Sequence, residues 1–133
     1  MGKFTKIGFF PGVWDLLHPG HIRALNEAKK HCDYLIVGVN RNPTRGNPNK
    51  NKPIMSWKER LEILKGIKSV DQVLIYSDDE TLFKLDAKDY ADVRFMGSDH
   101  KGKDHHHIKA EIVYIPRNHK YSTTAIRERV KKT

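Results

Sequence analysis

Five short apolar runs alternate with stretches of helical periodicity, and this alternation constrains the fold more than any other feature. The runs span residues 7–10, 34–39, 70–76, 93–96 and 112–115. Runs of this length that are apolar on both faces are typical of buried strands in a parallel sheet. Strands that alternate with helices predict an α/β fold: one Rossmann-like domain with a five-stranded, mainly parallel sheet flanked by helices. The 133 residues are expected to form this single domain over 1–133.

Four helices are expected between and after these strands. Residues 21–32 place apolar side chains on one face, as in an amphipathic helix. Ser56 and Glu59 have the spacing of a capping box at the start of a second helix. A shorter helix is expected around residues 82–85, and a basic helix over about 125–131.

Polar segments follow four of the predicted strands. In an open α/β sheet, ligands bind beyond the carboxyl ends of the strands, near the point where the strand order reverses. The segments at 12–21, 41–53, 97–107 and 116–124 are therefore expected to form the functional site. The second lies in a loop of about 41–55 that is rich in Pro, Asn, Lys and Arg and is expected to be flexible.

Charge and cysteine content narrow the range of partners and environments. The chain has 25 Lys and Arg against 16 Asp and Glu, and its charge of +9 predicts attraction to anions, either nucleic acid or a small phosphate-bearing substrate. The one cysteine, Cys32, cannot form an internal disulfide, and neither a leader segment nor an apolar run of membrane-spanning length is evident. We therefore expect a cytoplasmic protein that does not contact a membrane.

His18 and His21 flank Pro19 and Gly20 at the expected start of the first helix. Proline suits the first helical position, and amides at a helix N-terminus bind anions, so the segment predicts a phosphate site to which two imidazoles add hydrogen bonds. Alternatively, the histidines are solvated or only cap the helix. A zinc site is less favoured, because His-x-x-His supplies two ligands and Cys32 lies inside the helix.

Two segments resemble signatures of one enzyme family. The segment GVWDLLHPGH, residues 12–21, resembles the Gly-x-(Phe/Trp)-Asp-x-x-His-x-Gly-His signature of the nucleotidyltransferase superfamily. Near the other end of the chain, RNHKYSTTAI, residues 117–126, resembles the Arg-x-x-x-x-Ser-(Thr/Ser)-Thr segment of its cytidylyltransferase branch. Over about residues 7–130 the chain resembles the small bacterial glycerol-3-phosphate cytidylyltransferases.

This resemblance implies transfer of CMP from CTP to a small phosphorylated alcohol, with glycerol 3-phosphate favoured, to give a CDP-alcohol and pyrophosphate. An adenylyltransferase acting on a sugar phosphate, such as heptose phosphate, shares the histidine motif and the Ser-Thr-Thr triplet and is the alternative. A non-catalytic nucleotide- or RNA-binding module is a more distant alternative. Mg²⁺ is expected to enter with the triphosphate, without direct protein ligands. The resemblance also implies a homodimer that does not bind nucleic acid.

Roles for individual residues follow from the same resemblance. His18, His21 and Arg117 would act in catalysis by contacting the triphosphate, while Lys68 and His119 would bind the acceptor. The residues implied in nucleotide binding are Gly12, Val13, Trp14, Asp15, Gly20, Lys50, Lys52, Gly97, Asp99, Ser122, Thr123 and Thr124. Asp15 is expected to orient the local backbone or a metal-bound water, and the hydroxyl triplet to hold the β and γ phosphates.

The chain departs from the family pattern at several positions. Val13 stands where relatives usually have Thr or Ser, and Lys68 stands where arginine is frequent. The segment RNHKYST, residues 117–123, stands where the family has RTEGIST. These changes alter the floor of the expected site, and the last of them bears on the choice of acceptor.

Some conspicuous side chains are expected to have ordinary structural roles. Trp14 and Trp57 are expected to pack rather than to stack on a base. The triplet at 105–107 is expected in an exposed loop, with at least one ring available to line the acceptor pocket. Adjacent side chains point in different directions, so the three histidines are not expected to share a metal ion.

Overall fold

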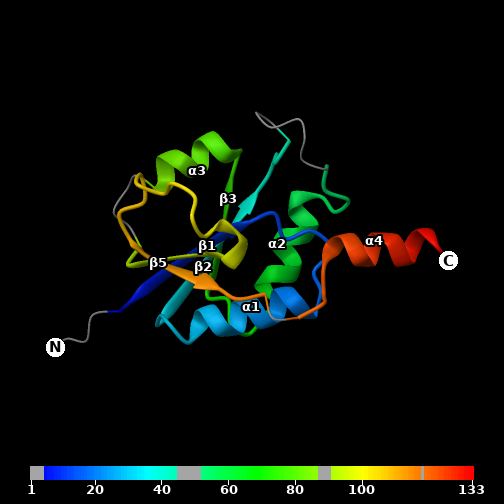
Figure 1. Ribbon diagram of the computed structural model, residues 1–133, viewed down its shortest axis with the longest axis horizontal. Helices are drawn as coiled ribbons and strands as arrows, with labels where there is room; N and C mark the ends of the chain where they lie inside the picture. The colour runs from blue at the N-terminus through cyan, green and yellow to red at the C-terminus, as the bar shows by residue number, and fades with distance from the viewer. Residues whose placement is uncertain (1–4, 45–51, 87–90, 118) are drawn as a thin grey trace.

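The protein forms an α/β sandwich around one parallel sheet (Figure 1). The computed structural model describes residues 5–44, 52–86, 91–117 and 119–133. In chain order the elements are β1 (Ile7–Gly12), α1 (Pro19–Lys29), β2 (Tyr34–Asn40), α2 (Trp57–Lys65), β3 (Gln72–Tyr76), α3 (Asp79–Asp86), β4 (Val93–Gly97), a 3₁₀ turn (Ser98–His100), β5 (Glu111–Ile115) and α4 (Thr123–Lys131). No helix in these described ranges is long and apolar enough to cross a bilayer.

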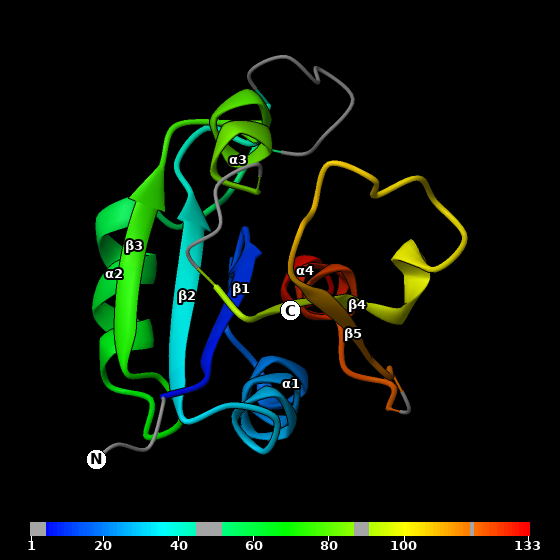
Figure 2. The same cartoon turned by 90° about the vertical axis from the view of Figure 1, so that its left-hand side faces the viewer.

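The strand order is β3-β2-β1-β4-β5, and every neighbouring pair is parallel. The predicted Rossmann-like fold is therefore confirmed. The chain moves outward from β1 to β3 and then crosses back to β4, so the strand order reverses between β1 and β4. These two strands pair only at Gly8 with Val93 and at Phe9 with Arg94. Beyond Phe9 they separate, as Figure 2 shows, and this opens space at the carboxyl end of the sheet.

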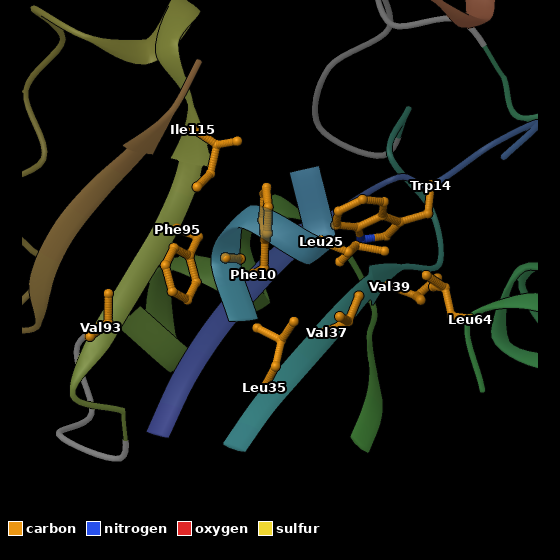
Figure 3. Close-up of a cluster of buried hydrophobic side chains, with 11 residues drawn as sticks. Phe10, Trp14, Leu25, Leu35, Val37, Val39, Leu64, Val93, Phe95 and Ile115 are labelled. Carbon is orange, nitrogen blue, oxygen red and sulfur yellow. The ribbon is translucent and has the colours of Figure 1, made fainter. Parts of the chain in front are cut away.

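The hydrophobic core lies between the sheet and the helices α1 and α2 (Figure 3). Leu25 and Ala28 of α1 and Leu64 of α2 are completely buried against the strands. Full burial of a leucine side chain contributes about 2 kcal/mol to the free energy of unfolding. The strand residues in this cluster are Phe10, Leu35, Val37, Val39, Val93, Phe95 and Ile115. These residues include members of four of the five apolar runs that predicted the strands.

Helix boundaries follow the capping residues. The capping box at the start of α2 is confirmed, because Ser56 Oγ accepts from the Glu59 amide at 3.1 Å and Glu59 Oε1 accepts from the Ser56 amide at 2.8 Å. The first helix begins at Pro19, which occupies the first helical position as expected, and His18 is its N-cap. The last helix begins at Thr123 rather than near residue 125, because Ser122 caps it.

Candidate active site

A cavity of about 600 Å³ opens where β1 and β4 separate. Its wall consists of the loop after β1, the starts of α1 and α4, and the segments that follow β4 and β5. The predicted site residues that line it are Gly12, Val13, Trp14, Asp15, His18, Gly20, His21, Gly97, Asp99, Arg117, His119, Ser122, Thr123 and Thr124. The tertiary structure thus brings the two sequence signatures together from opposite ends of the chain.

The loop after β1 has a strained backbone that is held by Trp14. Trp14 and Leu16 have φ angles of 59° and 48°, in the left-handed region that costs a non-glycine residue about 1 kcal/mol. The Trp14 side chain is buried, and its Nε1 donates to the Gly38 carbonyl oxygen at 3.0 Å. A Cβ at Gly12 would lie 3.0 Å from that Nε1, so a larger residue there would crowd the indole ring. The packing role expected for Trp14 is confirmed.

Asp15 connects three segments of the site. Its carboxylate accepts from the amides of Ile54 and Met55, both at 2.9 Å, and from Arg127 Nη2 at 2.8 Å. Burial alone raises the pKa of Asp15, but the two amides and Arg127 together outweigh it and lower the pKa. The Asp15 carbonyl oxygen also accepts from Thr123 Oγ1 at 3.1 Å. Asp15 therefore orients the backbone, as one of its two predicted roles requires.

Arg60 of α2 holds the loop after β1 through hydrogen bonds, and it was not predicted from the sequence. This side chain is 1% exposed, and its Nη1 donates to the carbonyl oxygens of Val13 at 2.7 Å and Asn40 at 2.8 Å. Its Nε also contacts the carbonyl oxygen of Met55 at 3.2 Å. One buried guanidinium therefore joins the loops that follow β1 and β2. The sequence feature that could have identified Arg60 is its position four residues before Leu64, because this spacing places both side chains on the buried face of α2.

His18 and His21 cap α1 and also line the cavity. His18 Nδ1 accepts from the Gly20 amide at 3.0 Å, and His21 Nδ1 accepts from the His18 amide at 3.1 Å. Since Nδ1 is an acceptor in both neutral rings, the proton of each ring is assigned to Nε2. The capping alternative and the cavity role are therefore compatible, because each ring uses one nitrogen for the helix and keeps one N–H donor.

This arrangement corrects the expectation that amides near His21 form the anion site. The Gly20 amide donates to His18 Nδ1, and the His21 amide donates to the His18 carbonyl oxygen at 3.0 Å. These two backbone donors are therefore engaged within the first turn of α1. The imidazole Nε2–H groups are the donors that this end of α1 can offer to a ligand.

Burial keeps both imidazoles neutral at pH 7. Desolvation, followed by repulsion from His18, lowers the pKa of His21 to about 4. Desolvation also lowers the pKa of His18, with smaller contributions from His119 and Arg117. The two rings are 3.9 Å apart between their centroids. A pair of neutral N–H donors so close together is suited to oxygens of a phosphate chain.

The start of α4 forms the opposite wall. Ser122 Oγ accepts from the Ala125 amide at 3.0 Å, and Thr123 Oγ1 donates to Asp15. Their hydroxyls therefore have structural partners in addition to their place at the cavity. Arg127 of the same helix also lines the cavity and was missed. Within the described ranges, its Nε is the buried side-chain nitrogen without a hydrogen-bond partner.

Of the lysines predicted to bind ligands, the two that the structure describes, Lys52 and Lys68, do not line the cavity. Lys50 lies outside the described residues, and Lys52 is exposed beside the cavity-lining Pro53. The structure does not bring Lys68, predicted to bind the acceptor, to either cavity. Lys68 is exposed between α2 and β3, at the amino end of β3, whereas the first cavity lies at the carboxyl ends of the strands. Asp99 does reach the cavity, with its Oδ1 folded against Gly97.

A second cavity of about 460 Å³ adjoins the first. The two share the end of β1, Gly97 and His100. Arg94 of β4 and Asp86 of α3 form a buried ion pair there, with Nε–Oδ1 and Nη2–Oδ2 distances of 2.9 and 3.1 Å. His107 Nε2 lies 3.6 Å from the same carboxylate. This charged pair between two elements was missed by sequence reasoning.

The histidine triplet divides between this cavity and solvent. His105 and His107 line the second cavity, whereas His106 is exposed and contacts Asp104. The His107 ring stacks on Phe83 at a centroid distance of 4.2 Å. The rings of His106 and His107 are nearly perpendicular, at 89°. His105 and His107 therefore line the second cavity, and the adjacent side chains of the triplet point in different directions.

The donor set of the first cavity contains imidazole, guanidinium and hydroxyl groups. Across the described ranges, no three His, Cys, Asp or Glu side chains come together as a metal-binding group. Both carboxylate oxygens of Asp15 accept hydrogen bonds from within the chain.

Sequence comparisons connect the chain with known proteins. A family model described as cytidylyltransferase-like matches residues 9–129. The bifunctional protein HldE of Hyphomonas neptunium is 38% identical over 128 residues, which cover 91% of this chain and 26% of that protein. The FAD synthase of Ferroglobus placidus is 38% identical over 112 residues, covering 78% of this chain and 72% of that protein. The chain thus spans about a quarter of the length of the HldE proteins that it matches.

Solved structures give the same fold. The lipopolysaccharide core biosynthesis protein from Thermoplasma volcanium superposes with a TM-score of 0.71 at 30% identity, over 90% of this chain and 100% of that one. A putative nicotinate-nucleotide adenylyltransferase from Vibrio parahaemolyticus superposes with a TM-score of 0.63 at 17% identity, over 97% of this chain and 88% of that one. This second likeness is one of fold alone.

Proposed function

The chain belongs to the cytidylyltransferase-like family of nucleotidyltransferases, and from this premise we propose that it adenylylates a sugar phosphate, releasing pyrophosphate from ATP. The observation that carries the proposal is the pair of neutral, Nε2-protonated imidazoles of His18 and His21, which line the same cavity as Arg117. Neutral donors and one guanidinium suit a triphosphate that must be bound and then partly released.

The names of the similar proteins lead us to propose ATP rather than CTP as the nucleotide donor. FAD contains an adenylyl group joined to a flavin phosphate, so a protein named FAD synthase, 38% identical to this chain, points to adenylyl transfer. A lipopolysaccharide core biosynthesis protein at 30% identity points to sugar chemistry. These relatives favour an adenylyltransferase, which was the alternative from the sequence. The two sequence motifs had instead favoured a cytidylyltransferase that uses CTP and glycerol 3-phosphate.

The geometry supports direct displacement at the α-phosphorus. A phosphate oxygen of the acceptor forms a new bond to that phosphorus, while the bond to the oxygen bridging to the β-phosphorus breaks. The electron pair of the broken bond leaves on pyrophosphate. His18, His21 and Arg117 would donate to the oxygens on which negative charge increases, and the rigid β1 loop would keep these donors in place. Mg²⁺ bound to the triphosphate would add positive charge at the same oxygens.

We assign the acceptor to the second cavity, because it meets the first at the end of β1. A phosphate placed at this junction would have its sugar beside Asp86, Arg94 and His107. Carboxylate, guanidinium and imidazole groups bind hydroxyls by accepting or donating hydrogen bonds. A polyhydroxylated acceptor suits this lining better than a purely apolar one.

Pyrophosphate release provides the test. The purified protein is mixed with Mg²⁺, with ATP or CTP, and with heptose, ribose, glycerol, ribitol or flavin phosphates in turn. We expect the fastest turnover with ATP and a sugar phosphate, and at least a ~10²-fold loss in His18→Ala, as for loss of a transition-state donor. His106→Ala is the matched control and is expected to keep wild-type turnover. Turnover with CTP alone would restore the cytidylyltransferase reading, and no turnover with any pair would contradict enzymatic function.

A further inference from the structure

We propose that His119 is a third imidazole donor of the triphosphate site, rather than an acceptor-binding residue. The proposal rests on the proposed function and deepens it. His119 stands where the family motif RTEGIST has glutamate. The sequence alone does not indicate where the imidazole ring lies. The structure places this ring at the first cavity, and the lining of the second cavity does not include it.

The start of α1 fixes the place of the ring. A Cβ built at Gly20 would lie 2.5 Å from His119 Cε1 and 2.7 Å from His18 Cε1. Both rings therefore pack over the same glycine, and the missing side chain provides the space for them. The His119 Nε2 would be 3.0 Å from that Cβ, so this nitrogen also lies at the start of α1. His119 reaches this point from the segment after β5, which makes it a link between the two signatures.

The hydrogen bonding of His119 repeats that of His18 and His21. His119 Nδ1 accepts from the Tyr121 amide at 3.1 Å, which assigns the ring proton to Nε2. All three rings thus use Nδ1 to hold the backbone and carry a donor on Nε2. The Tyr121 ring lies beside His119 at a centroid distance of 5.6 Å and contacts the Arg23 guanidinium on α1 at 5.5 Å. These contacts hold the His119 segment against α1.

The electrostatics agree with this placement. After desolvation, repulsion from His119 is the next largest cause of the lowered pKa of His18, and His119 also contributes to the lowered pKa of His21. Three imidazoles and Arg117 therefore face the same volume. Donors that come from both the start of α1 and the segment after β5 suit a chain of phosphate groups, whose oxygens are distributed along its length.

Two substitutions separate the two nitrogens of His119. In His119→Asn the side-chain oxygen can replace Nδ1 as acceptor for the Tyr121 amide, while the outer donor is lost. In His119→Gln the longer side chain can place an N–H near the position of Nε2. His106→Asn is the control, because His106 is exposed and lies outside both cavity linings. Circular dichroism and the thermal midpoint check that each variant is folded.

Binding is measured by calorimetry with inorganic tripolyphosphate and with ATP, and turnover by pyrophosphate release. We expect His119→Asn to bind tripolyphosphate about 10-fold more weakly and to lower kcat/KM for ATP by about 10- to 100-fold, as for loss of one hydrogen bond to a charged group. The KM for the acceptor should change less than about twofold, and His119→Gln should recover part of the loss.

Other outcomes have distinct meanings. Wild-type tripolyphosphate affinity in His119→Asn, or a change in the acceptor KM alone, would overturn the assignment of His119. A larger loss in His119→Gln than in His119→Asn would show that the ring only positions the backbone, because asparagine keeps the acceptor for the Tyr121 amide, and would also overturn it. A wild-type protein that binds tripolyphosphate but transfers no nucleotide would contradict the proposed function, while the binding comparison would still test His119.

Discussion

At the scale of single residues, the site is built from side chains with two tasks each. His18, His21 and His119 hold the backbone through Nδ1 and present Nε2, and Asp15 joins two amides to Arg127. The motif identified His18 and His21 from the sequence, because the spacing of glycine and histidine is characteristic. Their tautomers could not be predicted, because they depend on amides that the fold brings within hydrogen-bonding distance.

The lowered pKa of His21 leads to a prediction about stability. The unfolded chain binds a proton at His21 near pH 6.5, whereas the folded protein does so at about 4. The contribution of the neutral ring is therefore complete above about pH 6.5 and is lost as the pH falls from there towards 4. We expect urea denaturation to give a lower free energy of unfolding at pH 5 than at pH 7.5.

The variant His21→Asn isolates this effect, since asparagine can still accept from the His18 amide. Its free energy of unfolding should fall less between pH 7.5 and pH 5 than that of the wild type. An equal loss in the wild type and in His21→Asn would rule out His21 as the source.

At the scale of the elements, buried charges hold the loops between strands and helices. Arg60 joins α2 to the ends of β1 and β2, and the Arg94–Asp86 pair joins β4 to α3. The apolar periodicity of the sequence predicted the elements but not these links. Arginines in a helix or strand are most often solvent-exposed, and only their positions among buried neighbours distinguish Arg60 and Arg94.

We expect Arg60→Met to lower the free energy of unfolding by about 3 kcal/mol, because several buried carbonyl oxygens lose their donor while the volume is largely kept. Urea denaturation at pH 7.5 measures the change. Arg129→Met, at an exposed arginine of α4, is the matched control and should stay within about 0.5 kcal/mol of the wild type. A loss in Arg60→Met no larger than the control would disprove the supporting role.

At the scale of the whole molecule, the reversal of strand order creates two adjoining cavities with different linings. The first has imidazoles and hydroxyls from both ends of the chain, and the second has the buried ion pair and His107. The separation of β1 from β4 places them on either side of the end of β1. Donor and acceptor can therefore be recognised by different residues.

A substitution in the second cavity should affect one substrate alone. We expect His107→Ala to raise the KM for the acceptor by up to about 10-fold, since one hydrogen bond to the sugar is lost, and to leave the KM for ATP unchanged. Steady-state kinetics with each substrate varied in turn measure both constants. His106→Ala should change neither. A higher KM for ATP in His107→Ala would show that the two cavities do not separate the substrates.

The sequence by itself determined the strands, the helices, the parallel sheet and the two signatures, because these depend on local periodicity and on residue spacing. Only the tertiary structure decided which of the predicted residues meet. Lys68 precedes β3 and so lies at the amino end of the strands, away from the cavity. His119 follows β5 and lies beside His18 over Gly20. The physical reason is that hydrogen bonding between residues distant in sequence, and the separation of β1 from β4, fix which side chains share a cavity.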